Sequence, residues 1–131
     1  MTMGSSRERG AAAVEFALLL PVLILILLGI MEFGRAFNTQ AVLTGAARES
    51  VRVMVISEDT SRAKTAAVTA GVLRPELTAS NIAITVPGST AADPCPAGST
   101  ASVTVSYSLS TLTGIAGPFN MTGKGVMLCG G

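Results

Sequence analysis

The sequence predicts an α+β fold, in which a long amino-terminal helix and a short second helix precede a small antiparallel sheet tied by one disulfide. Three observations support this prediction. An apolar run occupies residues 11–31, and apolar residues keep a helical spacing beyond it to about residue 56. From residue 77 onward the spacing changes to two, and this part holds fifteen serines and threonines but two charged residues.

The apolar run is long enough to cross a lipid bilayer. Its 21 residues, Ala11–Met31, include one charged side chain, Glu15. At about 1.5 Å of rise per residue, this length matches a hydrocarbon core of roughly 30 Å. The chain after the run lacks the small-x-small pattern of a signal peptidase site, and the run exceeds the ~7–15 residues of a signal-peptide core. We therefore predict a retained transmembrane helix over residues 11–31.

Glu15 is the exceptional residue of this helix. A carboxylate costs roughly 2.5–3.5 kcal/mol at the centre of a membrane helix, and less near an end. Cleavage after Gly10, which follows a charged segment at residues 7–9, would create an α-amine on Ala11, four residues before Glu15. Such an amine is largely protonated at neutral pH. It could neutralise Glu15 on the same helix or on a neighbouring one.

These residues resemble a known family. A charged leader, Gly10, four small or apolar residues, Glu15, Phe16 and an apolar run follow the order of a type IV prepilin cleavage and assembly motif. The string RGAAAVEFALLLPVLILILLGIMEFGRAF, followed by LTGAARESVR, is similar to the TadE-like pseudopilins of the tight-adherence (Tad/Flp) pilus. The resemblance covers about residues 9–52. It implies a pilin-like fold, cleavage by a prepilin peptidase between Gly10 and Ala11, and a role of Glu15 and Phe16 in assembly.

The resemblance also implies a function and partners. It suggests a structural minor pilin or pseudopilin for the assembly or initiation of a Tad/Flp-type pilus involved in adhesion. Its partners would be the inner membrane, the prepilin peptidase, other pilins and the Tad assembly platform, and after assembly it could be extracellular. Major Flp pilins resemble little more than the helix, so the additional domain points to a minor component. The alternative is an uncleaved single-pass anchor that binds a partner or scaffolds a secretion apparatus outside any filament.

The amino-terminal residues 1–10 form a polar segment that we predict to be a leader peptide, too short and hydrophilic to fold. An ordinary cytoplasmic tail is the alternative. Arg7 and Arg9 favour a cytoplasmic amino terminus by the positive-inside rule, although Arg35 beyond the helix reduces the bias. The predicted orientation in a bacterial inner membrane is N-in, C-out.

The first helix is predicted to contain a kink and then to continue outside the membrane. Pro21 removes a backbone donor and crowds the carbonyl of Ala17, which favours a kink or a loosened turn. Over residues 32–56 the helix becomes amphipathic. Its predicted apolar face consists of Phe33, Ala36, Phe37, Leu43, Ala47, Val51 and Met54. Polar residues such as Thr39 are expected elsewhere, and the apolar face could pack on this chain's sheet or on other subunits.

The remaining chain is divided into a helical linker and a β domain. Residues 57–76 contain caps and a short helix at about Asp59–Ala70 that ends before a glycine. Residues 77–131 should form a small extracytoplasmic domain with strands near residues 82–86, 102–110 and 121–129. The third strand has a weak pattern, because Gly123 and Gly125 interrupt it.

The two cysteines and the overall composition limit the chemistry. Cys95 and Cys129 predict one disulfide in an exported domain, with two free thiols as the alternative. The chain has no histidine, which argues against zinc and histidine-based catalysis, and its net charge of +1 offers no basic surface for nucleic acid. A Ser-Lys hydrolase using Lys64 or Lys124 remains a formal alternative. We predict no enzyme, metal, cofactor or small-molecule substrate.

Overall fold

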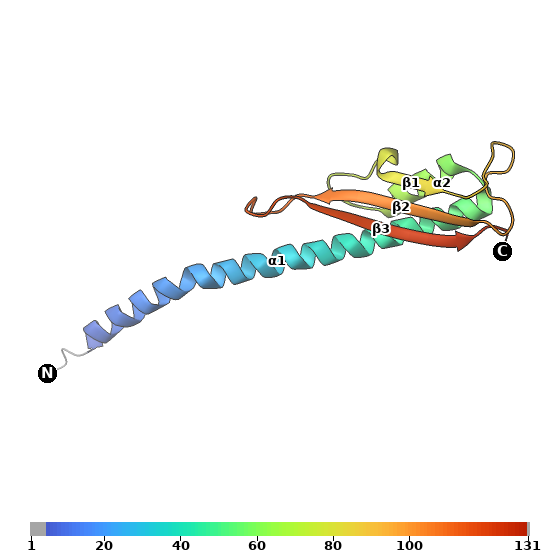
Figure 1. The fold of residues 1–131 in the computed structure, drawn as a ribbon. Coiled ribbons are helices and arrows are strands. Elements are labelled where there is room, and N and C mark those ends of the chain that lie inside the picture. Colours follow the sequence, from blue (N-terminus) through green and yellow to red (C-terminus); the bar gives the residue numbers. More distant parts are fainter. Residues whose placement is uncertain (1–4, 131) are drawn as a thin grey trace. The chain divides into compact units, whose positions relative to one another are not determined.

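The computed structural model describes residues 5–130, and the chain divides into two compact units, Met1–Arg35 and Ala36–Gly131. Helix α1, Ser5–Ser57, begins in the first unit and ends in the second. The other elements belong to the second unit and are α2 (Thr60–Ala70), the 3-10 helix η1 (Ala79–Asn81), β1 (Ile82–Thr85), β2 (Thr100–Leu109) and β3 (Phe119–Leu128) (Figure 1). The predicted α+β fold class is confirmed.

The start of α1 differs from the prediction. The helix begins at Ser5 instead of Ala11, so the described part of the predicted leader is helical. Residues 7–9 are Arg-Glu-Arg, which are good helix formers, and Glu8 lies in the first turn, where the helix dipole favours an acidic side chain. Gly10 alone costs about 1 kcal/mol relative to alanine, which is too little to end the helix.

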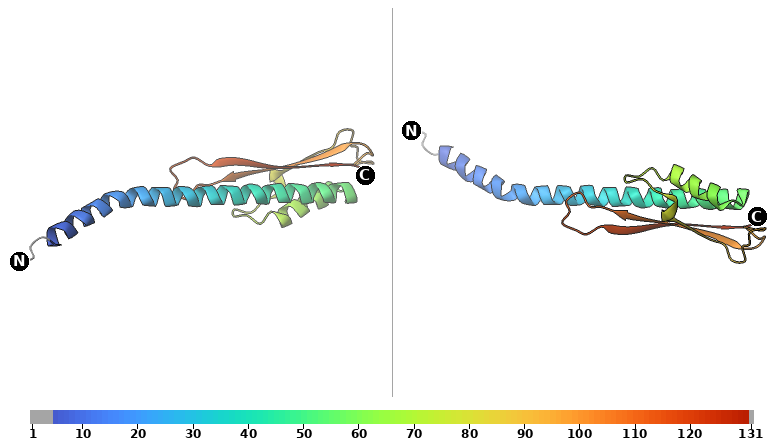
Figure 2. Two further views of the ribbon diagram at one scale, coloured as in Figure 1. Left: turned by 90° about the horizontal axis from the view of Figure 1, so that it is seen from below. Right: turned by 90° about the horizontal axis from the view of Figure 1, so that it is seen from above.

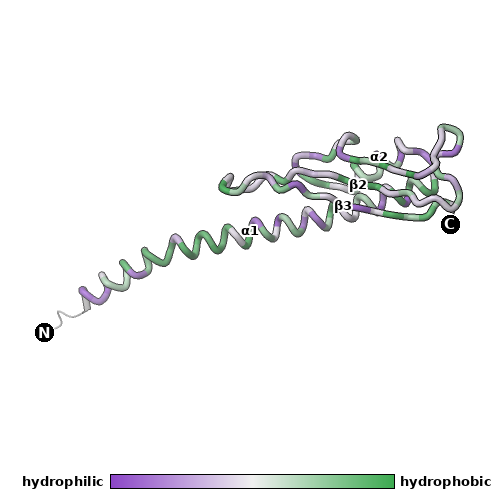
Figure 3. Tube along the Cα trace, viewed as in Figure 1, coloured by the Kyte–Doolittle hydropathy of each residue, from purple (hydrophilic) through white to green (hydrophobic). Residues whose placement is uncertain are grey.

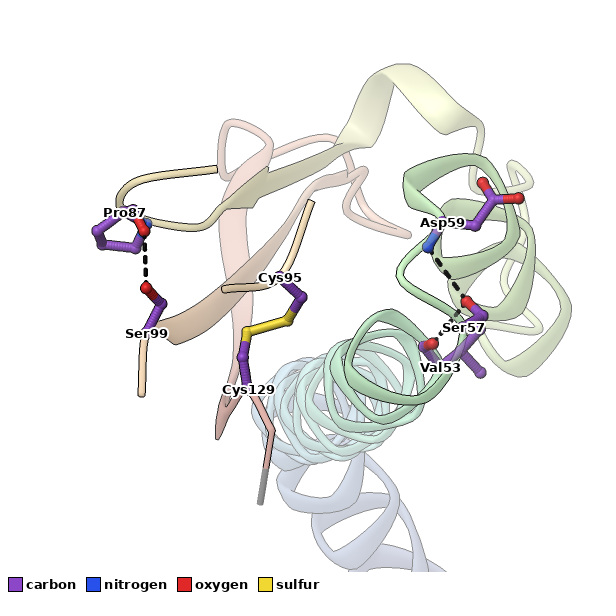
Figure 4. Close-up of a disulfide and its surroundings, with 7 residues drawn as sticks. All are labelled: Val53, Ser57, Asp59, Pro87, Cys95, Ser99 and Cys129. Atoms are coloured by element: carbon purple, nitrogen blue, oxygen red, sulfur yellow. Dashed lines mark hydrogen bonds between the residues drawn. A yellow bond between two sulfur atoms is a disulfide. The ribbon is translucent and has the colours of Figure 1, made fainter. Parts of the chain in front are cut away.

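Hydrogen-bonded caps define the junction between α1 and α2. The Ser57 hydroxyl donates to the Val53 carbonyl at 2.7 Å and accepts from the Asp59 N–H at 3.3 Å (Figure 4). Asp59 caps α2, because its carboxylate accepts from the N–H groups of Ser61 and Arg62 at 2.8 and 3.2 Å. The caps and the second helix therefore occur where the sequence predicted them.

Small buried side chains line the helices of the second unit. Ala46 on α1 and both Ala63 and Ala67 on α2 are buried. Ser50 of α1 is also fully buried, and its hydroxyl donates to the Ala63 carbonyl at 2.7 Å. This bond joins the two helices and satisfies a hydroxyl that would otherwise be costly to bury.

The sheet is antiparallel, with the strand order β1-β2-β3. Alternate residues of β2 from Ala101 to Leu109 are buried, while the serines and threonines between them are exposed or half-buried. The predicted period of two is therefore confirmed. The buried Tyr107 of β2 donates from its hydroxyl to the Pro75 carbonyl at 3.0 Å, so the phenol keeps a hydrogen-bond partner.

Strand β3 lies directly on the backbone of α1 at two glycines. A Cβ atom added at Gly123 would collide with the backbone of Leu43 and would lie 2.7 Å from the Thr44 nitrogen. A Cβ at Gly125 would lie 2.5 Å from the Ala47 carbonyl oxygen. The two residues that weaken the strand pattern in the sequence are thus the ones that allow the strand to contact the helix.

The predicted apolar face of α1 is partly wrong. Four of its seven residues are buried, namely Leu43, Ala47, Val51 and Met54. Phe33 and Phe37, however, are 67% and 63% exposed, whereas Thr39 is buried. Phe37 shares an i, i+4 row with the exposed Ala41 and Gly45. Thr39 shares its row with Leu43 and Ala47, which face the sheet.

Cys95 and Cys129 form the predicted disulfide, with a Cα–Cα distance of 5.5 Å (Figure 4). Both cysteines are buried, and neither is a free thiol. The bridge joins the loop between β1 and β2 to the residue that follows β3. The Cys129 N–H also donates to the Ser99 carbonyl at 2.8 Å, so the bridge and the backbone hold this end of β3 together.

Removal of the bridge is expected to lower the free energy of unfolding of the second unit by about 3–4 kcal/mol. The bond spans 34 residues, and a loop of this length accounts for that amount of chain entropy. The comparison is between the parent chain and its Cys95→Ala/Cys129→Ala variant, unfolded by urea in a mild detergent. Tyr107, the one tyrosine in a chain without tryptophan, reports unfolding of the sheet. Equal unfolding free energies would contradict this expectation.

Candidate functional site

All five residues that the sequence associates with processing, assembly or a kink lie on α1 in the first unit. They are Gly10, Ala11, Glu15, Phe16 and Pro21. Each is exposed, as are all residues from Arg7 to Leu27. The structure therefore places the candidate site on the surface of one helix, where lipid or another protein could contact it.

This part of α1 concentrates exposed apolar side chains, seen as the green stretch of the helix in Figure 3. Those between 42% and 73% exposed are Val14, Phe16, Leu18, Leu19, Leu20, Val22, Leu23, Ile24, Leu25, Ile26, Leu27, Ile30 and Met31. Soluble monomers rarely expose so large a continuous apolar surface. Within the described residues, α1 is the helix long and apolar enough to span a membrane. These observations are consistent with membrane anchoring.

Glu15 is the one charged residue between Arg9 and Glu32. It lies about one helical turn after Ala11, because residues four apart share a helix face and are separated by about 6 Å along the axis. An α-amine at Ala11 would therefore stand on the face that carries the Glu15 carboxylate. Attraction between the two charges would be much stronger in lipid than in water.

The predicted processing bond, between Gly10 and Ala11, lies near the start of α1 and has a helical conformation. A Cβ atom at Gly10 would have no neighbour within 4 Å, so packing gives no reason for glycine at this position. Glycine makes a helix easier to unwind, by about 1 kcal/mol relative to alanine. The residue is thus unfavourable for the helix and useful for a reaction that needs an opened backbone.

Pro21 lies inside α1, and the helix continues through it. Because proline has no N–H, the carbonyl of Ala17 loses its usual helical partner. Figure 2 shows that α1 is curved in its first, blue part. Assignment of this curvature to Pro21 stays a prediction.

Sequence reasoning missed one feature of the second unit, the loop of residues 110–118 between β2 and β3. Ile115 in this loop is 81% exposed and Leu112 is 56% exposed. Isolated apolar residues among glycine, serine and threonine have no helical or strand period, so no pattern singled them out.

Within residues 5–130, the structure contains no group of three histidine, cysteine, aspartate or glutamate side chains that could hold a metal.

Comparison with known proteins gives a family match that lies on α1. Residues 10–52 match the family model described as TadE-like protein. The matched segment includes Gly10, Glu15 and Pro21 and ends within α1, before the sheet. No curated protein and no solved structure matches the chain at a significant level. The family resemblance predicted from the sequence is confirmed.

Proposed function

Because residues 10–52 match the TadE-like family model, we propose that this chain is a structural minor pilin or pseudopilin. It would be anchored in the bacterial cytoplasmic membrane, with its amino terminus inside and its second unit outside. Its role would be the assembly or initiation of a Tad/Flp-type pilus that serves adhesion. This role needs no catalytic group, metal, cofactor, nucleic acid or small-molecule substrate.

One observation carries the proposal. Glu15 is the single charge in an exposed apolar helix segment, and it follows the candidate processing bond by one helical turn. A protein that only needed an anchor would gain nothing from a carboxylate there, because the charge opposes insertion into lipid. A carboxylate that needs a partner before it is stable in lipid can instead direct subunits to one another.

The proposed assembly step follows from charge pairing. Prepilin peptidase would cut after Gly10 and leave a protonated amine on Ala11. In the membrane, the Glu15 carboxylate and an Ala11 amine would form a pair, within one subunit or between neighbouring pilins. Breaking such a pair in a medium of low polarity costs several kcal/mol, so the pair would favour the correct axial position of a subunit. The Tad assembly platform would act on subunits held in this way.

The helical state of the processing bond adds one requirement. The first turns of α1 must unwind before a peptidase can bind the backbone around Gly10 in an open form. Unwinding here breaks few hydrogen bonds, because the first four N–H groups of a helix have no partner within it. The position near the start of α1 and the glycine both favour this opening.

The second candidate is an uncleaved membrane anchor that scaffolds a secretion apparatus. The exposed apolar helix supports it equally well, because both proteins would insert in the membrane. The helical conformation across residues 5–10, continuous with the anchor, is the specific observation in its favour. The two candidates differ at the amino terminus of the mature chain.

We expect the protein purified from membranes of a strain with its own prepilin peptidase to begin at Ala11. Amino-terminal sequencing or intact mass measures this directly. A Gly10→Val variant should keep its leader, because a branched side chain would occupy the position beside the cut bond. Gly29→Val is the matched control: a Cβ atom at Gly10 or at Gly29 has no neighbour within 4 Å, so neither change should disturb the fold. A parent chain that retains Met1 or Thr2 would support the uncleaved anchor.

A further inference from the structure

The loop between β2 and β3 exposes large apolar side chains. Ile115 is 81% exposed, Leu112 is 56% exposed, and Phe119, which begins β3, is 46% exposed. Residues 110–119 contain no charged side chain. Exposure of three large apolar residues over such a short segment is unfavourable in water and favourable at an interface with lipid.

The loop has a defined shape that its own hydrogen bonds maintain. The Thr111 hydroxyl donates to the Ala116 carbonyl at 2.9 Å and accepts from the Gly114 N–H at 3.1 Å. Gly114 has a φ of 67°, in the left-handed region that glycine adopts without strain. Backbone groups that are already paired can enter a region with less water at lower cost.

Contacts inside the second unit show at which end the loop lies. The Gln40 amide donates to the Thr122 carbonyl at 2.8 Å, and further along Gly125 approaches the backbone of Ala47. The contacts pair Gln40 of α1 with Thr122 of β3 and then Ala47 with Gly125, in the same order along both elements. Strand β3 therefore runs parallel to α1 within this unit. The loop precedes β3 and therefore lies toward the end of the unit at which α1 enters, at Ala36.

Chain connectivity limits how far the start of the second unit can lie from the apolar segment. The segment ends at Met31, and only residues 32–35 separate it from Ala36. Four helical residues span about 6 Å.

We propose that the loop of residues 110–118 docks on the phospholipid surface and inserts Ile115 and Leu112 into the headgroup region. The apolar area of three side chains is far below the roughly 1,200–2,000 Å² of a stable protein interface. It is sufficient for lipid contact, because the anchor already holds the loop near the membrane at a high effective concentration. The inference rests on the membrane anchoring in the proposed function. It adds a second membrane contact that limits how the outer unit can tilt.

A tryptophan introduced into the loop can test this inference, because the full chain contains none. Ile115→Trp is compared with Ile56→Trp, whose parent residue is 73% exposed near the far end of α1. Each full-length variant is reconstituted in vesicles of phosphatidylethanolamine and phosphatidylglycerol, with or without brominated lipid. An indole about 5–10 Å below the lipid surface should lose roughly half of its emission to bromine. We expect this loss, and a blue shift, for Ile115→Trp and neither for Ile56→Trp.

Flotation of the vesicles separates failure of the anchor from failure of the loop. Protein that does not float with lipid would overturn the membrane anchor and this inference together. Protein that floats while both indoles remain accessible to aqueous acrylamide and insensitive to bromine would overturn the loop contact alone. A blue shift that grows with protein density in the membrane and does not respond to bromine would assign the loop to a second copy of the chain, and would also overturn the lipid contact.

Discussion

Replacement of Glu15 by glutamine should leave membrane insertion unchanged and abolish incorporation of the protein into pili. Glutamine has the same size and still forms hydrogen bonds, but it cannot form a charge pair with the Ala11 amine. Insertion should be no worse, because a neutral side chain is less costly to place in lipid than a carboxylate. The measurements are flotation of membranes for insertion, and the amount of this protein in sheared pili for incorporation.

Two further variants make this test specific for the charge. Glu15→Asp keeps the carboxylate and should retain part of the incorporation. Glu8→Gln is the matched control, since it makes the same chemical change at an exposed glutamate of α1 that lies before the proposed processing bond. It should have no effect on mature pili. Normal piliation with Glu15→Gln would refute the charge-pairing mechanism and leave the family match over residues 10–52 intact.

Replacement of Gly123 or Gly125 by alanine should strongly destabilise the second unit. At each position the added methyl group would overlap with the backbone of α1, where no side-chain rotation can relieve the contact. Overpacking of this kind lowers the free energy of unfolding by about 1–3 kcal/mol. We expect both variants at or above the upper end of this range, because the added methyl group would collide with backbone atoms, which cannot rotate away. Urea unfolding in mild detergent, followed by Tyr107 fluorescence, gives the free energy of unfolding.

The matched control for these variants is Gly45→Ala. Gly45 lies on α1 between the two contacts, is exposed, and has no atom within 4 Å of the position that an added methyl group would occupy. Alanine there should therefore stabilise the helix by about 0.5–1 kcal/mol. The same Gly→Ala change is thus expected to raise the free energy of unfolding at Gly45 on α1 and to lower it at Gly123 or Gly125 on β3. A Gly123→Ala chain as stable as its parent would show that the strand can move away from the helix at little cost.

The candidate site was predictable from the sequence to a large degree. Gly10, Glu15 and Pro21 form a pattern along one continuous helix, and their relation depends only on helical geometry. The predicted partner of Glu15, an amine on Ala11, stays a prediction, because it would exist only on a processed chain. The loop with Ile115 was missed, because its position near the start of the second unit depends on the direction of β3 relative to α1.

Local features of the chain were determined by the sequence alone. The apolar run predicts a helix that can span a membrane, and the alternation in β2 predicts a sheet with one buried face. The serine, aspartate and threonine within residues 57–60 predict a cap for α2, which Asp59 supplies. Each of these depends on residues that are close together in the chain. Cys95 and Cys129 are far apart, yet they were predictable because the chain has no other cysteine.

Only the tertiary structure decided which side of α1 faces the sheet and what the glycines of β3 do. The periodicity of α1 permits several rotations about the helix axis, and packing against the sheet selects the one that buries Thr39 and leaves Phe37 exposed. Gly123 and Gly125 look like defects in a strand until the helix backbone is placed against them. Close contact between two elements depends on their mutual position, which neither segment encodes by itself.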